Sequence, residues 1–187
     1  MPRIKPIQIT ESEGQSRQLL EEVQRNLGMV PNLLKTMAHS SAVLSGYLRF
    51  TQALSSALTA PLREQIALTV AGANRCDYCA SAHTALGVKV GIDSDELTKN
   101  LKAESTDIQT QAALRFARAV VDNRGWVNDD DLSDVRNAGY SESQIAEIVA
   151  VVALNTFTNY FNHVAGTDID FPKVDASKTK TATGNRD

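Results

Sequence analysis

The sequence predicts an all-α fold, in which packed and mostly antiparallel helices form a single domain. Apolar residues recur at helical spacing, as in Leu19, Leu20, Val23 and Leu27. Residue pairs with capping-box spacing and helix-ending glycines punctuate these runs. No segment shows the alternation of a half-buried strand, and β-branched residues are concentrated inside the helical runs. With 187 residues, the chain is long enough to bury a core without disulfide staples.

Each helix is predicted from residue types that favour its start or its end. Serine, threonine, aspartate and asparagine cap the first turn, proline is tolerated there, and glycine ends a helix. Residues 1–9 are expected to be extended. The expected starts are Thr10, Asn32, Ser40 or Ser41, Thr59 with Pro61, Cys76, Asp93, Thr106, Asn128 and Ser141. The expected ends are Gly28, His39, Asn74, Gly87 or soon after, Asn123, Gly139 and Gly166.

The last of these helices, from Ser141 to Gly166, is the longest. Ser141 and Gln144 have capping-box spacing at its start. Its apolar residues lie almost all round the helix, which is typical of a buried element. We therefore expect it to be the central helix of the domain.

Composition and charge exclude several functional classes. The net charge of −3 disfavours nucleic acid as a partner, because phosphate binding needs a basic surface. The longest apolar stretch, residues 145–154, contains Glu147 and is too short to span a membrane. The N-terminus has no apolar signal core, so a cytoplasmic protein is expected. The domain is assigned to residues 1–172, and the polar tail 173–187 is expected to be disordered.

The two cysteines and a nearby histidine form the most informative motif. Cys76, Cys79 and His83 are spaced i, i+3 and i+7, which places them along one face of a helix. Free N–H groups and the helix dipole stabilise a thiolate in the first turn, and the thiolate is the reactive form of cysteine. A small tightening of this turn would allow a disulfide. The dipole favours Cys76 as the nucleophile, whereas the histidine one turn later favours Cys79, so spacing leaves the choice open.

Glu64 adds a candidate proton acceptor to this motif. It lies twelve residues before Cys76, on the preceding predicted helix. Its helical neighbours Ala67, Leu68 and Ala71 are apolar, so we expect its carboxylate to be partly buried or to lie in a crevice. Such a carboxylate is suited to a proton relay.

Together, Glu64, Cys76, Cys79 and His83 resemble the core motif of the carboxymuconolactone decarboxylase superfamily, in its AhpD-like alkylhydroperoxidase branch. The matching pattern, E-x11-C-x2-C-x3-H, lies within residues 64–87. The flanking segments GMVPNLLKTMAHS and NYFNHVAGTDIDF also resemble peroxidase-related members, so the resemblance covers roughly residues 25–172.

The resemblance implies an all-helical homo-oligomer, a trimer or hexamer, that reduces hydroperoxides. It implies that Cys79 attacks the peroxide, that Cys76 resolves the sulfenic acid, and that His83 and Glu64 relay protons. It further implies that the redox-active Cys76–Cys79 disulfide is the only cofactor and that no metal is bound. The implied reductant is an external dithiol or a thioredoxin-like or lipoyl-like protein. Tyr78 stands where the best-studied members have a histidine; it can donate a hydrogen bond and is a candidate accessory residue.

Other functions are open for the same residues. A thiol–disulfide oxidoreductase, or a redox-responsive protein with little peroxidase turnover, needs the cysteine pair without a fast peroxide step. A zinc site would use Cys76, Cys79 and His83 as three ligands, with His39, His163 or Glu64 as the fourth. Two inert cysteines buried in a helix are the purely structural alternative.

Overall fold

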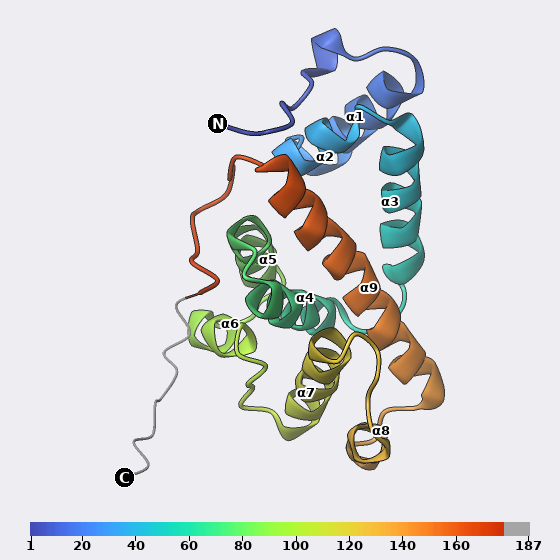
Figure 1. Ribbon diagram of the computed structural model, residues 1–187, viewed down its shortest axis with the longest axis vertical. Helices are drawn as coiled ribbons and strands as arrows, with labels where there is room; N and C mark the ends of the chain where they lie inside the picture. Colours follow the sequence, from blue (N-terminus) through green and yellow to red (C-terminus); the bar gives the residue numbers. More distant parts are fainter. Residues whose placement is uncertain (178–187) are drawn as a thin grey trace.

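The computed structural model describes residues 1–177, and within that range it contains helices and no strands (Figure 1). The predicted all-α fold is therefore confirmed. A short 3₁₀ turn at Ile9–Glu11 precedes the α-helices. In chain order the α-helices are α1 (Gly14–Leu27), α2 (Asn32–Met37), α3 (Ser41–Leu54), α4 (Ala60–Asn74), α5 (Asp77–Lys89), α6 (Ser94–Asn100), α7 (Ile108–Asp122), α8 (Asp129–Asn137) and α9 (Glu142–Ala165). None of them is long and apolar enough to cross a membrane, within the residues described.

Helix α9 is the central element, as its length predicts. It runs diagonally through the molecule and packs against α3, α4, α5 and α7 (Figure 1). Ser141 and Gln144 form the predicted capping box, and Gly166 ends the helix in the left-handed conformation with φ 59°. The helix is not buried all round, because an outward stripe that includes Val149, Phe157 and Val164 is exposed.

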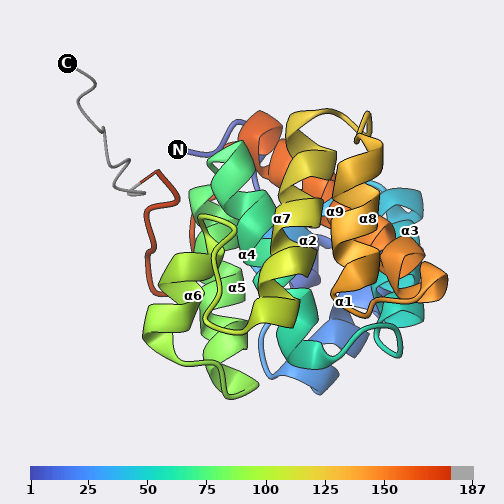
Figure 2. The ribbon, with the colours of Figure 1, turned by 90° about the horizontal axis from the view of Figure 1, so that it is seen from below.

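Two hydrophobic clusters meet at α4. One lies among α1, α2, α3, α5 and α6 and includes Leu68 and Ala71 of α4. The other lies among α4, α7, α8 and α9 and includes Ile66 and Val70. Seen from below, α7 lies between α4 and α8 (Figure 2). Helix α4 therefore contributes side chains to both clusters and connects them.

Several predicted helix starts shift by a few residues. Thr10 and Glu13 do not form a capping box; Gln8 and Glu11 form one around the 3₁₀ turn, and α1 begins at Gly14. The cap of α7 is Asp107, whose carboxylate accepts a hydrogen bond from the Thr110 amide, and not Thr106. The predicted caps at Ser40, Thr59, Asp93, Asn128 and Ser141 are confirmed.

A segment that we call the C-terminal strap, residues 167–177, follows α9 and runs back along α5 and α6 (Figure 1). The amide of Val174 donates to Ser81 Oγ over 2.9 Å, and the amide of Ala176 donates to Asp77 Oδ1 over 2.9 Å. The side chain of Ala176 is 1% exposed. The expectation of disorder from residue 173 is therefore wrong for residues 173–177, because backbone hydrogen bonds dock this polar segment; residues 178–187 lie outside the described residues.

Candidate active site

The turn between α4 and α5 places the first cysteine at a helix start. Helix α4 ends at Asn74, and Arg75 takes the left-handed conformation with φ 53°. This reverses the chain, so that Cys76 becomes the N-cap of α5, close to its predicted start. Its sulfur accepts a hydrogen bond from the Cys79 amide over 3.3 Å. The first turn of α5 thus points its free N–H groups toward the cysteine pair.

The two cysteines form a disulfide within this turn. Their Cα atoms are 5.3 Å apart, which lies within the range that a disulfide spans. Each cysteine is only 2% exposed, and both belong to the cluster among α1, α2, α3, α5 and α6. The spacing i, i+3 is therefore compatible with a disulfide, as the sequence predicts.

Glu64 and His83 also meet, as the family resemblance implies. Oε2 of Glu64 lies 2.7 Å from Nδ1 of His83, and both side chains are mostly buried. Because a carboxylate only accepts, Nδ1 carries the hydrogen of this bond and Nε2 is the ring nitrogen left to exchange a proton. The pair joins α4 to α5 one turn beyond Cys79.

Tyr47 lies beside Glu64 and stays uncharged. Burial raises the pKa of the Tyr47 phenol, a hydrogen bond with Thr51 opposes this, and the charge of Glu64 adds to the increase. Because its phenol is neutral, Tyr47 adds no second negative charge near Glu64.

The two predicted pairs are not joined by a direct hydrogen bond. Within residues 1–177, the hydrogen bonds that reach the two sulfurs come from the Cys79 amide and from Asn162. In the same range, His83 makes no hydrogen bond to either sulfur. Nδ2 of Asn162 lies 3.3 Å from Sγ of Cys79. The neighbour of Cys79 that sequence reasoning missed is therefore an amide at the end of α9.

A pattern in α9 could have revealed Asn162. Three asparagines, Asn155, Asn159 and Asn162, have spacing i, i+4 and i+7 and so lie on one face of a helix that is otherwise rich in apolar residues. All three are buried. Buried amides need hydrogen-bond partners, so this row predicts polar contacts inside the domain. Asn159 accepts a hydrogen bond from Asn74 Nδ2 over 3.2 Å, at the end of α4.

Tyr78 has a supporting position. Its hydroxyl accepts a hydrogen bond from the Leu33 amide over 3.1 Å, and its ring packs edge-on against Phe171 of the strap. Burial raises the pKa of the Tyr78 phenol far above its ordinary value; the Leu33 amide opposes this and the charge of Asp170 adds to it. Tyr78 therefore cannot replace the base that a histidine would supply here, and it ties α2 and the strap to α5.

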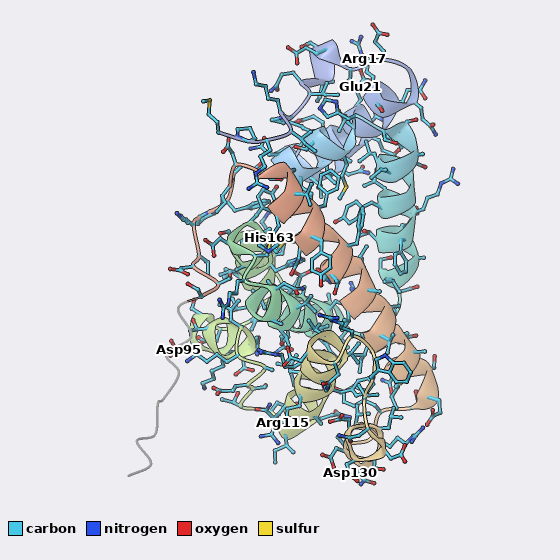
Figure 3. All side chains as sticks on the ribbon, in the orientation of Figure 1. Arg17, Glu21, Asp95, Arg115, Asp130 and His163 are labelled. Atoms are coloured by element: carbon cyan, nitrogen blue, oxygen red, sulfur yellow. A yellow bond between two sulfur atoms is a disulfide. The ribbon has the colours of Figure 1, made fainter. Side chains whose placement is uncertain are left out.

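A pocket of about 220 Å³ opens beside the disulfide. It is lined at the start of α5 by Cys76 and at the end of α9 by Asn162 and His163, with Thr167 of the strap. Figure 3 shows His163 where the end of α9 approaches α5. A pocket of about 330 Å³ between α7 and α8 is lined in part by Arg115 and by neither cysteine; Figure 3 shows Arg115 well below His163, toward the lower end of the molecule.

The residues considered for a zinc site are dispersed. Nε2 of His39 lies 2.8 Å from the Lys5 carbonyl oxygen, and Nε2 of His163 lies 2.9 Å from the Asn74 carbonyl oxygen. Glu64 contacts His83. In the described part of the chain, no three His, Cys, Asp or Glu side chains gather in an arrangement suited to a metal ion.

Comparison with known proteins shows that this site is similar to that of a known family. The profile of the carboxymuconolactone decarboxylase family matches residues 41–122, which include Glu64, Cys76, Cys79 and His83. No curated protein matches the chain significantly.

Solved structures share the whole fold. A peroxidase-related protein from Ralstonia eutropha JMP134, described as an alkylhydroperoxidase AhpD core, has a TM-score of 0.79 and 26% identity, over 90% of this chain and 92% of its own. A peroxidase-related protein from Silicibacter sp. TM1040 has a TM-score of 0.76 and 24% identity, over 89% and 92% of the two chains. A variant of the debrominase Bmp8 in complex with 2,3,4-tribromopyrrole has a TM-score of 0.77 and 20% identity, over 90% and 91%. At these identities the last two show likeness of fold alone.

Proposed function

We propose that the chain, whose residues 41–122 match the carboxymuconolactone decarboxylase family and whose fold resembles an AhpD core, is a thiol-dependent hydroperoxide reductase of the AhpD-like branch. One observation carries the proposal: a disulfide between Cys76 and Cys79 in the first turn of α5, with the Glu64–His83 pair on the same two helices. The two cysteines can store two electrons as a dithiol, and the imidazole of His83 can exchange protons.

The proposed oxidative half of the cycle starts from the reduced pair. The Cys79 thiolate attacks the terminal oxygen of the hydroperoxide, which breaks the O–O bond and forms a sulfenic acid on Cys79. The leaving alkoxide takes a proton from His83, whose protonated ring the Glu64 carboxylate stabilises. The Cys76 thiol then attacks the sulfenic sulfur, so that water leaves and the Cys76–Cys79 disulfide forms.

An external dithiol completes the cycle by thiol–disulfide exchange. A thioredoxin-like or lipoyl-like protein is the kind of partner that supplies two thiols in one molecule. The cycle needs no cofactor besides the cysteine pair. A cytoplasmic location, where thiol reductants are plentiful, suits this requirement.

The direct test is stopped-flow consumption of an organic hydroperoxide by the reduced protein. We expect one equivalent to be consumed quickly per chain, with loss of two free thiols. Cys79→Ser should abolish the fast phase, and Cys76→Ser should leave a sulfenic acid that a dimedone probe labels. Fast consumption that survives both substitutions would remove the mechanism.

A thiol–disulfide oxidoreductase is the second candidate function. It is favoured by the absence of a hydrogen bond from His83 to either sulfur within the described residues. Comparing the rate of reaction with an organic hydroperoxide and with a small disulfide separates the two functions. A peroxidase should react much faster with the hydroperoxide, whereas a thiol–disulfide oxidoreductase should not.

The proposal includes assembly into a trimer or hexamer. The outward stripe of α9, with Val149, Phe157, Tyr160 and Val164, is exposed, and it borders an apolar groove against the end of α7. Exposed apolar patches of this kind mark interaction sites. Light scattering coupled to size exclusion should give a mass three or six times that of the chain, and Val164→Asp together with Tyr160→Asp should lower it.

A further inference from the structure

The two sulfurs of the disulfide have different surroundings. Cys76 lines the pocket of about 220 Å³, whereas Cys79 does not. The sulfur of Cys79 instead contacts Nδ2 of Asn162, a side chain that is 5% exposed. A thiolate that reduces a disulfide attacks one sulfur along the S–S axis, and the opposite sulfur leaves with the electron pair. Cys76 is therefore the cysteine that borders the pocket through which a thiol could approach.

The chemistry of the sulfur fixes which end of Asn162 faces it. A disulfide sulfur carries no hydrogen and can only accept, so the donor Nδ2 must point toward Cys79. A hydrogen bond strengthens when its acceptor gains a negative charge, and burial increases that effect. Asn162 therefore favours the state in which Cys79 is a thiolate.

The opposite end of the amide lacks a hydrogen-bond partner within the described residues. Oδ1 of Asn162 and Oγ1 of Thr167 are both buried without a hydrogen-bond partner, and both residues line the pocket. Buried polar atoms are ordinarily satisfied. An entering molecule with a polar group near its thiol would satisfy them.

We infer that the external thiolate attacks Cys76 from this pocket and that Asn162 stabilises Cys79 as the leaving thiolate; the inference rests on the redox cycle proposed above. A new S–S bond forms between the reductant sulfur and Cys76, the Cys76–Cys79 bond breaks, and its electron pair stays on Cys79. The second thiolate of the dithiol then attacks the first reductant sulfur. This step forms the disulfide of the reductant and releases Cys76 as a thiolate. Cys79 is returned in the form that the peroxide step uses.

Mapping the mixed disulfide tests the site of attack. The oxidised full-length protein is mixed briefly with β-mercaptoethanol, quenched with acid, and alkylated with N-ethylmaleimide. Tryptic cleavage after Arg75 places both cysteines on one peptide, residues 76–89, and fragment ions that end between them locate each adduct. We expect the mercaptoethanol on Cys76 and the maleimide on Cys79. The reverse pattern, or an equal mixture, would overturn the inference.

A matched pair of variants tests Asn162. Asn162→Leu removes the donor to Cys79, and Asn159→Leu removes a similarly buried amide that accepts a hydrogen bond from Asn74 and makes none to either sulfur. We expect Asn162→Leu to slow reduction by dithiothreitol about tenfold and to lower the thiolate absorbance of the reduced protein at neutral pH, as loss of a hydrogen bond to a charged group predicts. Asn159→Leu should retain both within about twofold, since it leaves the sulfur contact in place. Equal slowing in both variants would contradict the assignment.

Asn162→Gln and Asn162→Ser provide the second measurement. Both keep a donor without adding an apolar group, so they should recover part of the lost rate. These assays contain no peroxide. A protein that exchanges thiols in this way without reducing hydroperoxides would therefore refute the proposed function and leave the inference standing, and fast peroxide reduction with attack on Cys79 would do the reverse.

Discussion

Nδ1 of His83 lies 2.7 Å from Oε2 of Glu64, and this contact links α5 to α4. Glu64→Gln keeps the size of the side chain and removes its charge, so a protonated His83 ring loses its stabilising partner. We expect the hydroperoxide reaction to slow by about tenfold to a hundredfold, in line with the contribution of general acid–base catalysis. Stopped-flow rates measure the effect, with Glu22→Gln on the exposed face of α1 as the control. An unchanged rate in Glu64→Gln would exclude the pair from the proton relay.

Glu96 gives the fold a pH dependence. Burial raises the pKa of its carboxyl, but hydrogen bonds from Ser105, Thr106 and Asn100 outweigh this and hold the pKa below its ordinary value. Folding therefore favours the ionised form. Its stabilisation is complete above the pKa that Glu96 has in the unfolded chain, and it is lost as the pH falls through the lower pKa of the folded state.

Glu96→Gln should therefore lower the free energy of unfolding at neutral pH by about 1–2 kcal/mol. The difference from the wild type should shrink as the pH falls below about 4, because the wild-type carboxyl is then protonated in the unfolded state and increasingly in the folded state. Urea denaturation at a series of pH values measures it. A difference that is constant down to acid pH would show that the ionised carboxylate is not the source of the stability.

Gly72 allows α4 and the end of α6 to approach closely. A Cβ added at Gly72 would overlap the carbonyl oxygen of Leu101, which is backbone and cannot move aside as a side chain does. We expect Gly72→Ala to lower the free energy of unfolding by about 2 kcal/mol or more, despite the better helix propensity of alanine. Thermal denaturation measures this loss. Gly46→Ala on α3, where a Cβ meets open space, is the control and should stabilise the fold slightly.

Ser81 fastens the C-terminal strap to α5. Its Oγ donates to the Asp77 carbonyl oxygen over 2.7 Å and accepts from the Val174 amide over 2.9 Å. In Ser81→Ala the Val174 amide loses its acceptor, so hydrogen exchange at that amide should accelerate, and stability should fall by about 1 kcal/mol. Exchange at amides in the middle of α9 should change little by comparison. Equal acceleration in both places would indicate a general loss of stability and not a local release of the strap.

The helices and the cysteine pair follow from the sequence because local spacing determines them, whereas the family resemblance implied the pairing of Glu64 with His83. Capping by Ser141 and the end at Gly166 depend on neighbours within a few residues. The 3.6-residue period brings Cys76 near Cys79, and the short turn at Arg75 brings α4 back against α5, so that Glu64 meets His83.

Contacts between distant segments were not predictable in the same way. Asn162 is 83 residues from Cys79, and only the crossing of α9 over α5 brings them together. The docking of Ala176 depends on an aspartate almost a hundred residues earlier, so a polar tail alone suggested disorder. Asp93 and Glu96 have capping-box spacing, yet Glu96 turns to the loop at Ser105 because that loop offers several donors to its carboxylate.

The short separation of the two cysteines in the chain affects how much the disulfide contributes to the stability of the fold. A disulfide stabilises a protein mainly by restricting the unfolded chain, and the restriction grows with the length of the loop that it closes. With only two residues between Cys76 and Cys79, the loop is very short. Reduction should therefore lower the melting temperature less than the loss of a disulfide that closes a long loop would, and repeated turnover would proceed on a scaffold that depends comparatively little on the bond for its integrity.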